Sequence, residues 1–266
     1  SGFPINDGGM FAVMMRDLRV NGFALPTYTT YNFLNIPYAY PPLGFYLGAF
    51  LELIGISVTQ ILTWLPAIFT ALTVPLFYLL AKQLMHDRPR AALATAFFAF
   101  APGNYVWLLM GGGLTRALGT LFFASALIFT LRTFQTPSWR TTGLALVSCV
   151  LVVLSHPQMA FLTALSCFIF GVFLIRSRTA ALHAFAIGVG TLLLTSPWWA
   201  IVILRHGVEP FLSAGQSGNL SMSLTALWEN LISLQTIIPF ATLFRWLGLG
   251  WAIYKRRFDL LIWGFL

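Results

Sequence analysis

Long apolar stretches, separated by short polar loops, run through the sequence from about residue 59 to its end. Each stretch approaches the roughly 20 residues that a helix needs to cross the hydrocarbon core of a bilayer. Hydrophobic residues make up 58% of the chain and charged residues 8%, whereas an ordinary soluble domain has about 25% charged residues. The sequence therefore predicts an all-α, polytopic transmembrane helix bundle. We expect the spans at 59–83, 91–110, 117–134, 141–155, 159–175, 181–201 and 236–254, with an eighth beginning at 258.

The formal net charge is +8, from 15 basic and 7 acidic residues. In a soluble protein this excess would raise the question of nucleic acid, but here the basic residues are dispersed at the ends of the apolar stretches instead of forming one basic face. The charge therefore indicates membrane topology. We expect membrane lipids as partners and no nucleic acid.

Alternate loops differ in their basic residues, which favour the cytoplasmic side of a membrane protein. The loops near 86, 136, 176 and 256 are predicted to be cytoplasmic, and the loops at 111–116, 155–157 and 205–235 to lie on the opposite side with residues 1–58. This indicates a multi-pass protein of the cell or plasma membrane with its site on the extracytoplasmic face. The basic set is Lys82, Arg88, Arg90, Arg132, Arg140, Arg176, Arg178, Lys255, Arg256 and Arg257.

Residues 1–58 are predicted to form an extracytoplasmic first loop with juxtamembrane helices, and residues 59–266 the helix bundle. Within the first loop, residues 10–18 suit a short amphipathic helix in the membrane interface. Residues 23–42 are predicted to be irregular, with aromatic rings at the headgroup level. The apolar helix at 41–55 is expected not to cross, because a crossing there would reverse the side of every later loop.

Both ends of the sequence suggest a piece of a longer protein. It starts at Ser1 without Met and ends in the apolar run 260–266. We expect a membrane helix before Ser1, since an external loop has to be delivered across the membrane by a preceding segment.

Few polar groups converge on the predicted outer face, and Asp7 is the leading candidate among them. A carboxylate can accept a proton, and a cation such as Arg116 or His156 could hold a phosphate. Asp7 also precedes Gly8-Gly9 and an apolar helix, which is the pattern of an N-cap. The two roles are compatible, because a cap occupies one carboxylate oxygen.

The loops between the spans offer further phosphate-binding candidates. Gly111–Gly113 could form a nest of backbone N–H groups completed by Arg116; the alternative is a tight turn with Arg116 anchored to lipid headgroups. His156 lies between two apolar spans, where an ionisable group is a functional candidate; the alternative is a histidine that serves the turn. Arg245 falls inside a predicted span and should face the bundle interior or a partner.

Asp17 and Tyr40 complete the predicted substrate-binding set. Tyr40 is one of several tyrosines in the first loop. Asp17 could face substrate, or it could sit on the polar face of its helix with Arg16 and Arg19. The two cysteines, at 149 and 167, fall in apolar runs and indicate neither a disulfide framework nor a metal motif.

The first loop resembles that of a known enzyme class. The first external loop of the integral-membrane GT-C glycosyltransferases is similar in four features: Asp7, an M-x-x-D-L-type interface helix at Met10–Leu18, a Tyr-rich loop, and Tyr40-Pro41-Pro42-Leu43-Gly44-Phe45-Tyr46-Leu47. The similarity is greatest to the group with the protein mannosyltransferases and the lipid A aminoarabinose transferase. It covers about residues 4–55, and the rest agrees in architecture.

The resemblance implies transfer of a sugar, with inversion, from a polyprenyl-phosphate-linked donor to an acceptor on the external face. In that family the loop aspartate that matches Asp7 acts as base or as metal ligand. Many members have a second acid beside it, whereas the neighbours here are Asn6 and Gly8. We therefore predict Asp7 as general base, assign no cofactor, and leave a divalent metal open.

Two other functions remain open from the sequence. A secondary transporter would place polar groups and broken helices near the membrane midplane, whereas here the polar groups lie at one face, apart from Arg245. A non-catalytic membrane subunit of glycan assembly, or a polymerase or ligase of lipid-linked glycans, would need an activity measurement to exclude it. The absence of a G-x-G-x-x-G unit argues against a soluble nucleotide-sugar domain in this chain.

Overall fold

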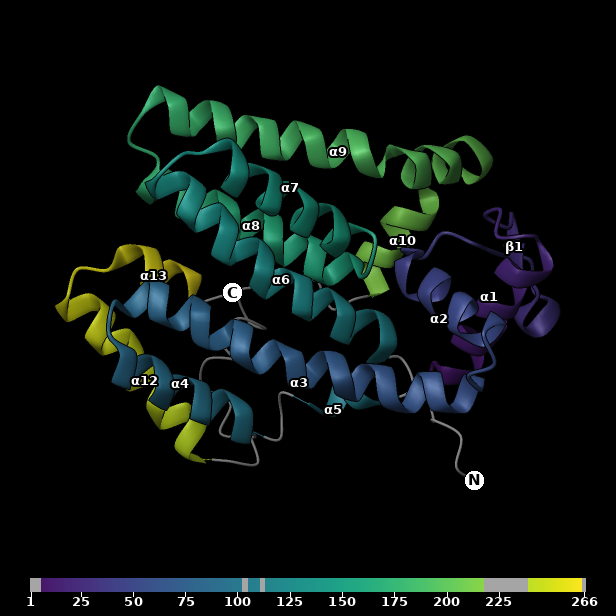
Figure 1. The fold of residues 1–266 in the computed structure, drawn as a ribbon, viewed down its shortest axis with the longest axis horizontal. Helices are drawn as coiled ribbons and strands as arrows, with labels where there is room; N and C mark the ends of the chain where they lie inside the picture. Colours follow the sequence, from purple (N-terminus) through teal and green to yellow (C-terminus); the bar gives the residue numbers. More distant parts are fainter. Residues whose placement is uncertain (1–5, 102–104, 111–112, 218–238, 265–266) are drawn as a thin grey trace.

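The computed structural model describes residues 6–101, 105–110, 113–217 and 239–264, and it is an all-α bundle with one small β-hairpin. Long helices lie side by side, and α1, α2 and the hairpin gather at one end of them (Figure 1). The elements are α1 Gly8–Val20, β1 Tyr28–Thr29, η1 Tyr31–Phe33, β2 Ile36–Pro37, α2 Leu43–Leu53, α3 Val58–Met85, α4 Arg88–Phe100, α5 Val106–Leu109, α6 Gly113–Gln135, α7 Trp139–Val153, α8 Pro157–Leu174, α9 Arg178–His206, α10 Glu209–Ser217, α12 Pro239–Tyr254 and α13 Phe258–Trp263.

Within the described residues, α3, α6, α8 and α9 are long and apolar enough to cross a membrane. They correspond to four of the predicted spans. Helix α6 is central, since it packs against α3, α7, α8 and α9. In its most apolar window 61% of the residues are buried, against 17–28% in the other three helices. The remaining faces of those helices are apolar and exposed, as expected for surfaces that contact lipid.

The predicted span at 91–110 is wrong as a single helix. Helix α4 ends at Phe100, Ala101 is extended with ψ 100°, and α5 covers four residues. The physical reason is local, because the proline that follows Ala101 disfavours helical backbone in the residue before it.

The two remaining apolar helices that pack on this bundle are short. Helix α7 has 15 residues, close to the short span predicted at 141–155. Helix α2 has 11 residues, or about 16 Å, which is too short to cross a hydrocarbon core of about 30 Å. This length agrees with the predicted juxtamembrane position of α2. Near the end of the chain, α12 lies within the predicted span at 236–254 and ends at the same residue, and α13 begins at 258, where the eighth helix was expected.

The loops sort to opposite ends of the bundle in the predicted order. At one end the backbone N–H of Leu43 donates to Leu154 O at 2.8 Å, which joins the first loop to the end of α7. Arg205 at the end of α9 donates to Leu25 O at 2.8 Å, also in the first loop. At the other end His86, Gln135 and three arginines of the basic set line one cavity. We call these the loop end and the arginine end.

The first loop has its own packed core, on the α3 and α6 helices of the bundle. Phe11, Met15 and Leu18 of α1 are buried against Phe45 of α2 and Leu114 of α6. Glycine permits this close approach of α1 to α2, since a Cβ at Gly48 would overlap the Met15 side chain. An ion pair between Arg19 and Glu52, 2.7 Å long, adds a second link between α1 and α2. The loop that was predicted to be irregular contains the β1–β2 hairpin.

Candidate functional site

Asp7 stands at the N-cap position of α1, but its side chain does not cap the helix. Its backbone carbonyl accepts the first helical hydrogen bond, from Phe11 N at 2.9 Å. Its carboxylate makes no cap hydrogen bond and is exposed. The side-chain cap considered for Asp7 is therefore absent, and the carboxylate is available to a ligand at the loop end.

Tyr40 links the first loop to the start of α6. Its hydroxyl lies 3.3 Å from Thr115 Oγ1. Burial raises the pKa of Tyr40, the Thr115 hydrogen bond and the Arg116 charge oppose that shift, and the Asp7 charge adds to it. Asp7 and Arg116 thus both lie within electrostatic reach of the Tyr40 hydroxyl. Tyr40 is thus joined to the first turn of α6, which carries Arg116, while Asp7 acts on it through its charge.

His156 is the fourth member of this group. It precedes α8 and is 5% exposed, and its ring centroid lies 6.2 Å from that of Tyr40. Its side chain makes no cap hydrogen bond, and its Nδ1 is buried without a partner among the described residues. Burial, and then the charge of Arg116, lower the pKa of His156 to about 3. The imidazole is therefore neutral near pH 7.

Helix packing fixes the position of His156. Its Cβ lies against Gly119 of α6, where an added Cβ would be 2.9 Å from that of His156 and 3.1 Å from Met159 Cγ. Any larger residue at position 119 would push α8 away from α6. The glycine thus holds the imidazole beside the first turn of α6, which carries Arg116.

Arg116 is half-buried, with its guanidinium 5.8 Å from the Trp107 ring centroid. The predicted glycine nest beside it is only partly within the described residues, because 111–112 lie outside them. The N–H of Gly113 already donates to Met110 O at 2.6 Å. The N–H of Gly113 is therefore already used within the chain, and the predicted nest cannot include it.

Asp17 has a different role from the predicted one. It is 8% exposed, and its carboxylate accepts hydrogen bonds from Thr29 Oγ1 at 2.7 Å, Thr30 N at 2.9 Å and Thr30 Oγ1 at 2.6 Å. It neither joins the other four site residues nor pairs with Arg16 or Arg19. It ties the hairpin to α1 and so supports the loop that carries Tyr40.

A cavity of about 750 Å³ opens beside this group, between the first loop and the α9–α10 region. Tyr40 and Pro157, the neighbour of His156, contribute to its wall. The apolar part of the wall consists of Met10, Met14, Ile36, Pro37, Ala39, Pro41, Trp198, Pro210, Phe211 and Ala214, and the polar part of Tyr28, Thr29, Arg205, His206, Glu209 and Ser213. A mostly apolar wall with a few polar groups is typical of a ligand site.

Sequence reasoning assigned no role to Arg205 or His206, which form part of this wall. Arg205 donates to the carbonyls of Leu25 and Pro26, and the His206 ring lies 2.9 Å from Thr27 O. These contacts close the cavity by fastening the end of α9 to the first loop. The charged cluster 205–209 at the end of a predicted span was the available signal.

A metal centre of three or more ligands is not formed by the described side chains: no such group of His, Cys, Asp or Glu lies close enough together among them. The side chain of Arg245 is outside the described residues. Comparison of the sequence with protein-family models and with characterised proteins finds no match. Function is therefore inferred from the geometry and the sequence pattern.

Proposed function

We propose that this chain is a GT-C-like glycosyltransferase, which moves a sugar from a polyprenyl-phosphate-linked donor to an acceptor at the extracytoplasmic face. The observation that carries the proposal is that Tyr40, which lines the 750 Å³ cavity, packs near the His156 ring and feels the charges of Asp7 and Arg116. These residues are far apart in the sequence. They supply a carboxylate, a cation and an unpartnered neutral imidazole at the loop end, remote from the basic loops.

Each group has a chemical task in the transfer. The acceptor hydroxyl oxygen attacks the anomeric carbon, the bond from that carbon to the phosphate oxygen breaks, and the configuration inverts. The acceptor proton passes to the Asp7 carboxylate, which contributes about 10²–10⁴-fold as a general base. The phosphate leaves with the bonding electrons, and Arg116 stabilises its charge in a setting with little water.

His156 and Tyr40 are suited to hold the reactants. A neutral imidazole forms hydrogen bonds without adding a second charge beside Arg116. Its Nδ1 is buried without a partner among the described residues, which costs free energy unless a reactant supplies the hydrogen bond. The charges of Asp7 and Arg116 both act on the Tyr40 hydroxyl, in opposite directions.

The distribution of charge favours an enzyme over a transporter. In the four candidate spans within the described residues, Asp, Glu, Lys, Arg and His occur only in the two turns at either end, as with Arg116, Arg132 and His183. A transporter would place such groups, and broken helices, near the midplane.

The test is transfer of a labelled sugar from a polyprenyl-phosphate donor by the full-length protein in membranes. Asp7→Asn should lower turnover at least about 100-fold, the lower limit for a general base, and leave donor binding unchanged. Asp87→Asn at the N-cap of α4 is the control, because Asn caps as well as Asp and position 87 lies at the arginine end. Turnover of the Asp7→Asn protein equal to wild type would remove Asp7 from the mechanism.

A second measurement separates donor binding from proton transfer. Arg116→Gln should raise the donor concentration needed for half-maximal rate, since it removes the charge that holds the phosphate. Running both assays with and without a chelator decides whether a divalent metal participates. A donor affinity untouched by Arg116→Gln would place the phosphate elsewhere.

A further inference from the structure

A second polar cavity, of about 260 Å³, lies at the arginine end of the bundle. It is formed where α3, α6 and α8 end and where the chain turns from α12 into α13. Its polar lining is Gln83, His86, Gln135, Arg176, Arg256, Arg257 and Asp259, and its apolar lining is Leu84, Phe173, Leu174 and Phe258. Nothing in the sugar-transfer mechanism uses this cavity.

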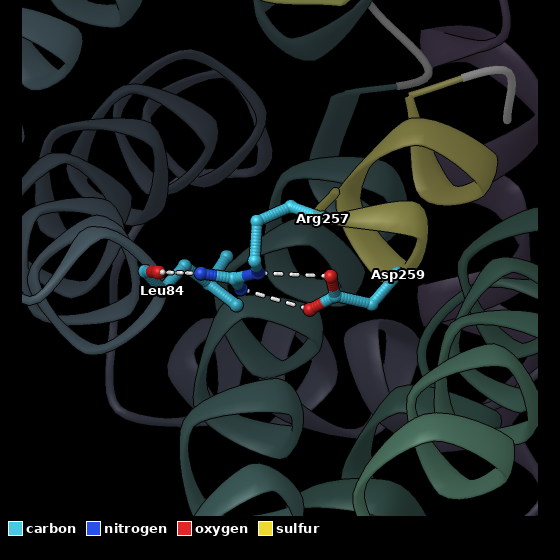
Figure 2. Close-up of polar contacts among 3 residues, drawn as sticks. All are labelled: Leu84, Arg257 and Asp259. Carbon is cyan, nitrogen blue, oxygen red and sulfur yellow. Dashed lines mark hydrogen bonds and ion pairs between the residues drawn. The ribbon is translucent and has the colours of Figure 1, made fainter. Parts of the chain in front are cut away.

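One of its three arginines is already satisfied by the protein. Arg257 donates from Nε and Nη2 to the two carboxylate oxygens of Asp259, at 2.9 and 2.8 Å, and from Nη1 to Leu84 O at 3.1 Å (Figure 2). This arrangement neutralises Asp259 and caps a carbonyl near the end of α3. Arg257 therefore builds the wall and is not available to a ligand.

The other two arginines have no such partner. The side chains of Arg176 and Arg256 are exposed, and neither forms a hydrogen bond or ion pair with a residue that the structure describes. His86 and Arg256 each adopt a left-handed backbone, with φ of 53°, which is uncommon outside glycine. Such backbone positions are often associated with functional sites. The cavity thus keeps two cations beside an imidazole and two amides, while its acid is already paired.

We propose that this cavity binds the phosphate of an anionic membrane lipid. Two guanidinium groups can chelate a phosphate through charge-assisted hydrogen bonds. The apolar side chains of Phe173, Leu174 and Phe258 on the same wall suit the glycerol and acyl region next to that phosphate, which a free phosphate ion would not use. The site is independent of the proposed sugar transfer, because it lies at the other end of the bundle.

Basic residues at helix ends also have a simpler explanation. They complement helix dipoles and set the membrane topology without any specific ligand. If that were their whole role here, neighbouring basic residues outside the cavity would contribute as much to lipid binding as Arg176 and Arg256 do. Arg178 and Lys255 provide the comparison, since they lie in the same two turns but do not line the cavity.

The experiment titrates the purified full chain, in neutral detergent, with phosphatidylglycerol and with phosphatidylcholine, and counts bound lipid by native mass spectrometry. The R176Q/R256Q protein should bind phosphatidylglycerol roughly 25-fold more weakly, from a loss of about five-fold for each basic residue at a membrane surface. The matched R178Q/K255Q protein should stay within about two-fold of wild type. R176K/R256K keeps the charge and should show an intermediate loss, because lysine cannot chelate the phosphate.

The outcomes separate the explanations. A loss of phosphatidylglycerol binding in R176Q/R256Q but not in R178Q/K255Q, with no competition by millimolar inorganic phosphate, supports a lipid-phosphate site. Competition by inorganic phosphate that depends on the same two arginines would show a phosphate site filled from solution and overturn the lipid assignment. An equal loss of phosphatidylglycerol binding in both double variants would show non-specific electrostatic attraction and overturn the proposal. Binding of phosphatidylcholine as tight as that of phosphatidylglycerol would overturn it as well.

Discussion

Asp17→Asn tests whether the first loop depends on one buried carboxylate. In the wild-type protein this carboxylate accepts three hydrogen bonds from Thr29 and Thr30. A hydrogen bond to a charged group contributes about 1.5–3 kcal/mol and a neutral one about 0.5–1.5 kcal/mol. Replacing the carboxylate by an amide therefore costs about 1 kcal/mol for each bond. The free energy required to open the hairpin should therefore fall by about 2–3 kcal/mol.

Hydrogen exchange at the Thr30 backbone N–H measures this loss directly, because that N–H donates to Asp17 at 2.9 Å. Opening should become roughly 30–150-fold more frequent in Asp17→Asn, as about 2–3 kcal/mol requires. Exchange in α6 should be unchanged. Asp87→Asn serves as the control, with its N-cap bond retained. An opening frequency within about two-fold of wild type would mean that the carboxylate does not hold the hairpin.

Two further predictions concern His156. Gly119→Ala should displace the imidazole and lower transfer at least several-fold, because its Cβ would lie 2.9 Å from that of His156; Gly143→Ala, which meets nothing within 4 Å, should leave transfer unchanged, and equal rates in the two proteins would contradict this packing. The pH dependence of unfolding should also report on the imidazole. Since the folded pKa of His156 is about 3 against an ordinary 6.5, the unfolded chain binds the proton first. The contribution of the neutral His156 to the free energy of unfolding is therefore fully present above about pH 6.5. It falls by up to about 1.4 kcal/mol per pH unit as the pH is lowered towards 3. His156→Gln should flatten that slope in melting experiments between pH 4 and 7, and an unchanged slope would show that another group causes it.

The main helices could be predicted from the sequence, because hydropathy is a property of each segment alone. The stretches at 59–83 and 117–134 become α3 and α6 with small changes at their ends. The apolar stretch 91–110 does not form one helix, because the helix breaks at Ala101. This break could have been predicted from the proline that follows. Hydropathy counts apolar residues, whereas helix continuity also requires backbone hydrogen bonds.

The candidate site was predictable in part, for a different physical reason. Asp7, Arg116 and His156 were identified because a polar group between apolar spans is rare enough to stand out. The contacts of Asp17 could not be predicted, because its partners, Thr29 and Thr30, are brought to it by the hairpin, which has no strong sequence signal. The roles of Arg205 and His206 likewise depend on where the end of α9 meets the first loop. Such long-range contacts are not encoded in any local pattern.

The side of the membrane on which the loop end lies is the most direct test of the site proposed here. In a protein whose Cys149 and Cys167 are replaced by serine, single cysteines would be introduced as Leu34→Cys at the loop end and Thr136→Cys at the arginine end, both at exposed positions. A membrane-impermeant maleimide applied to intact cells should label the Leu34→Cys protein and should reach the Thr136→Cys protein only after the cells are permeabilised. Labelling of Thr136→Cys in intact cells, with Leu34→Cys protected, would place Asp7 in the cytoplasm and contradict transfer at the extracytoplasmic face.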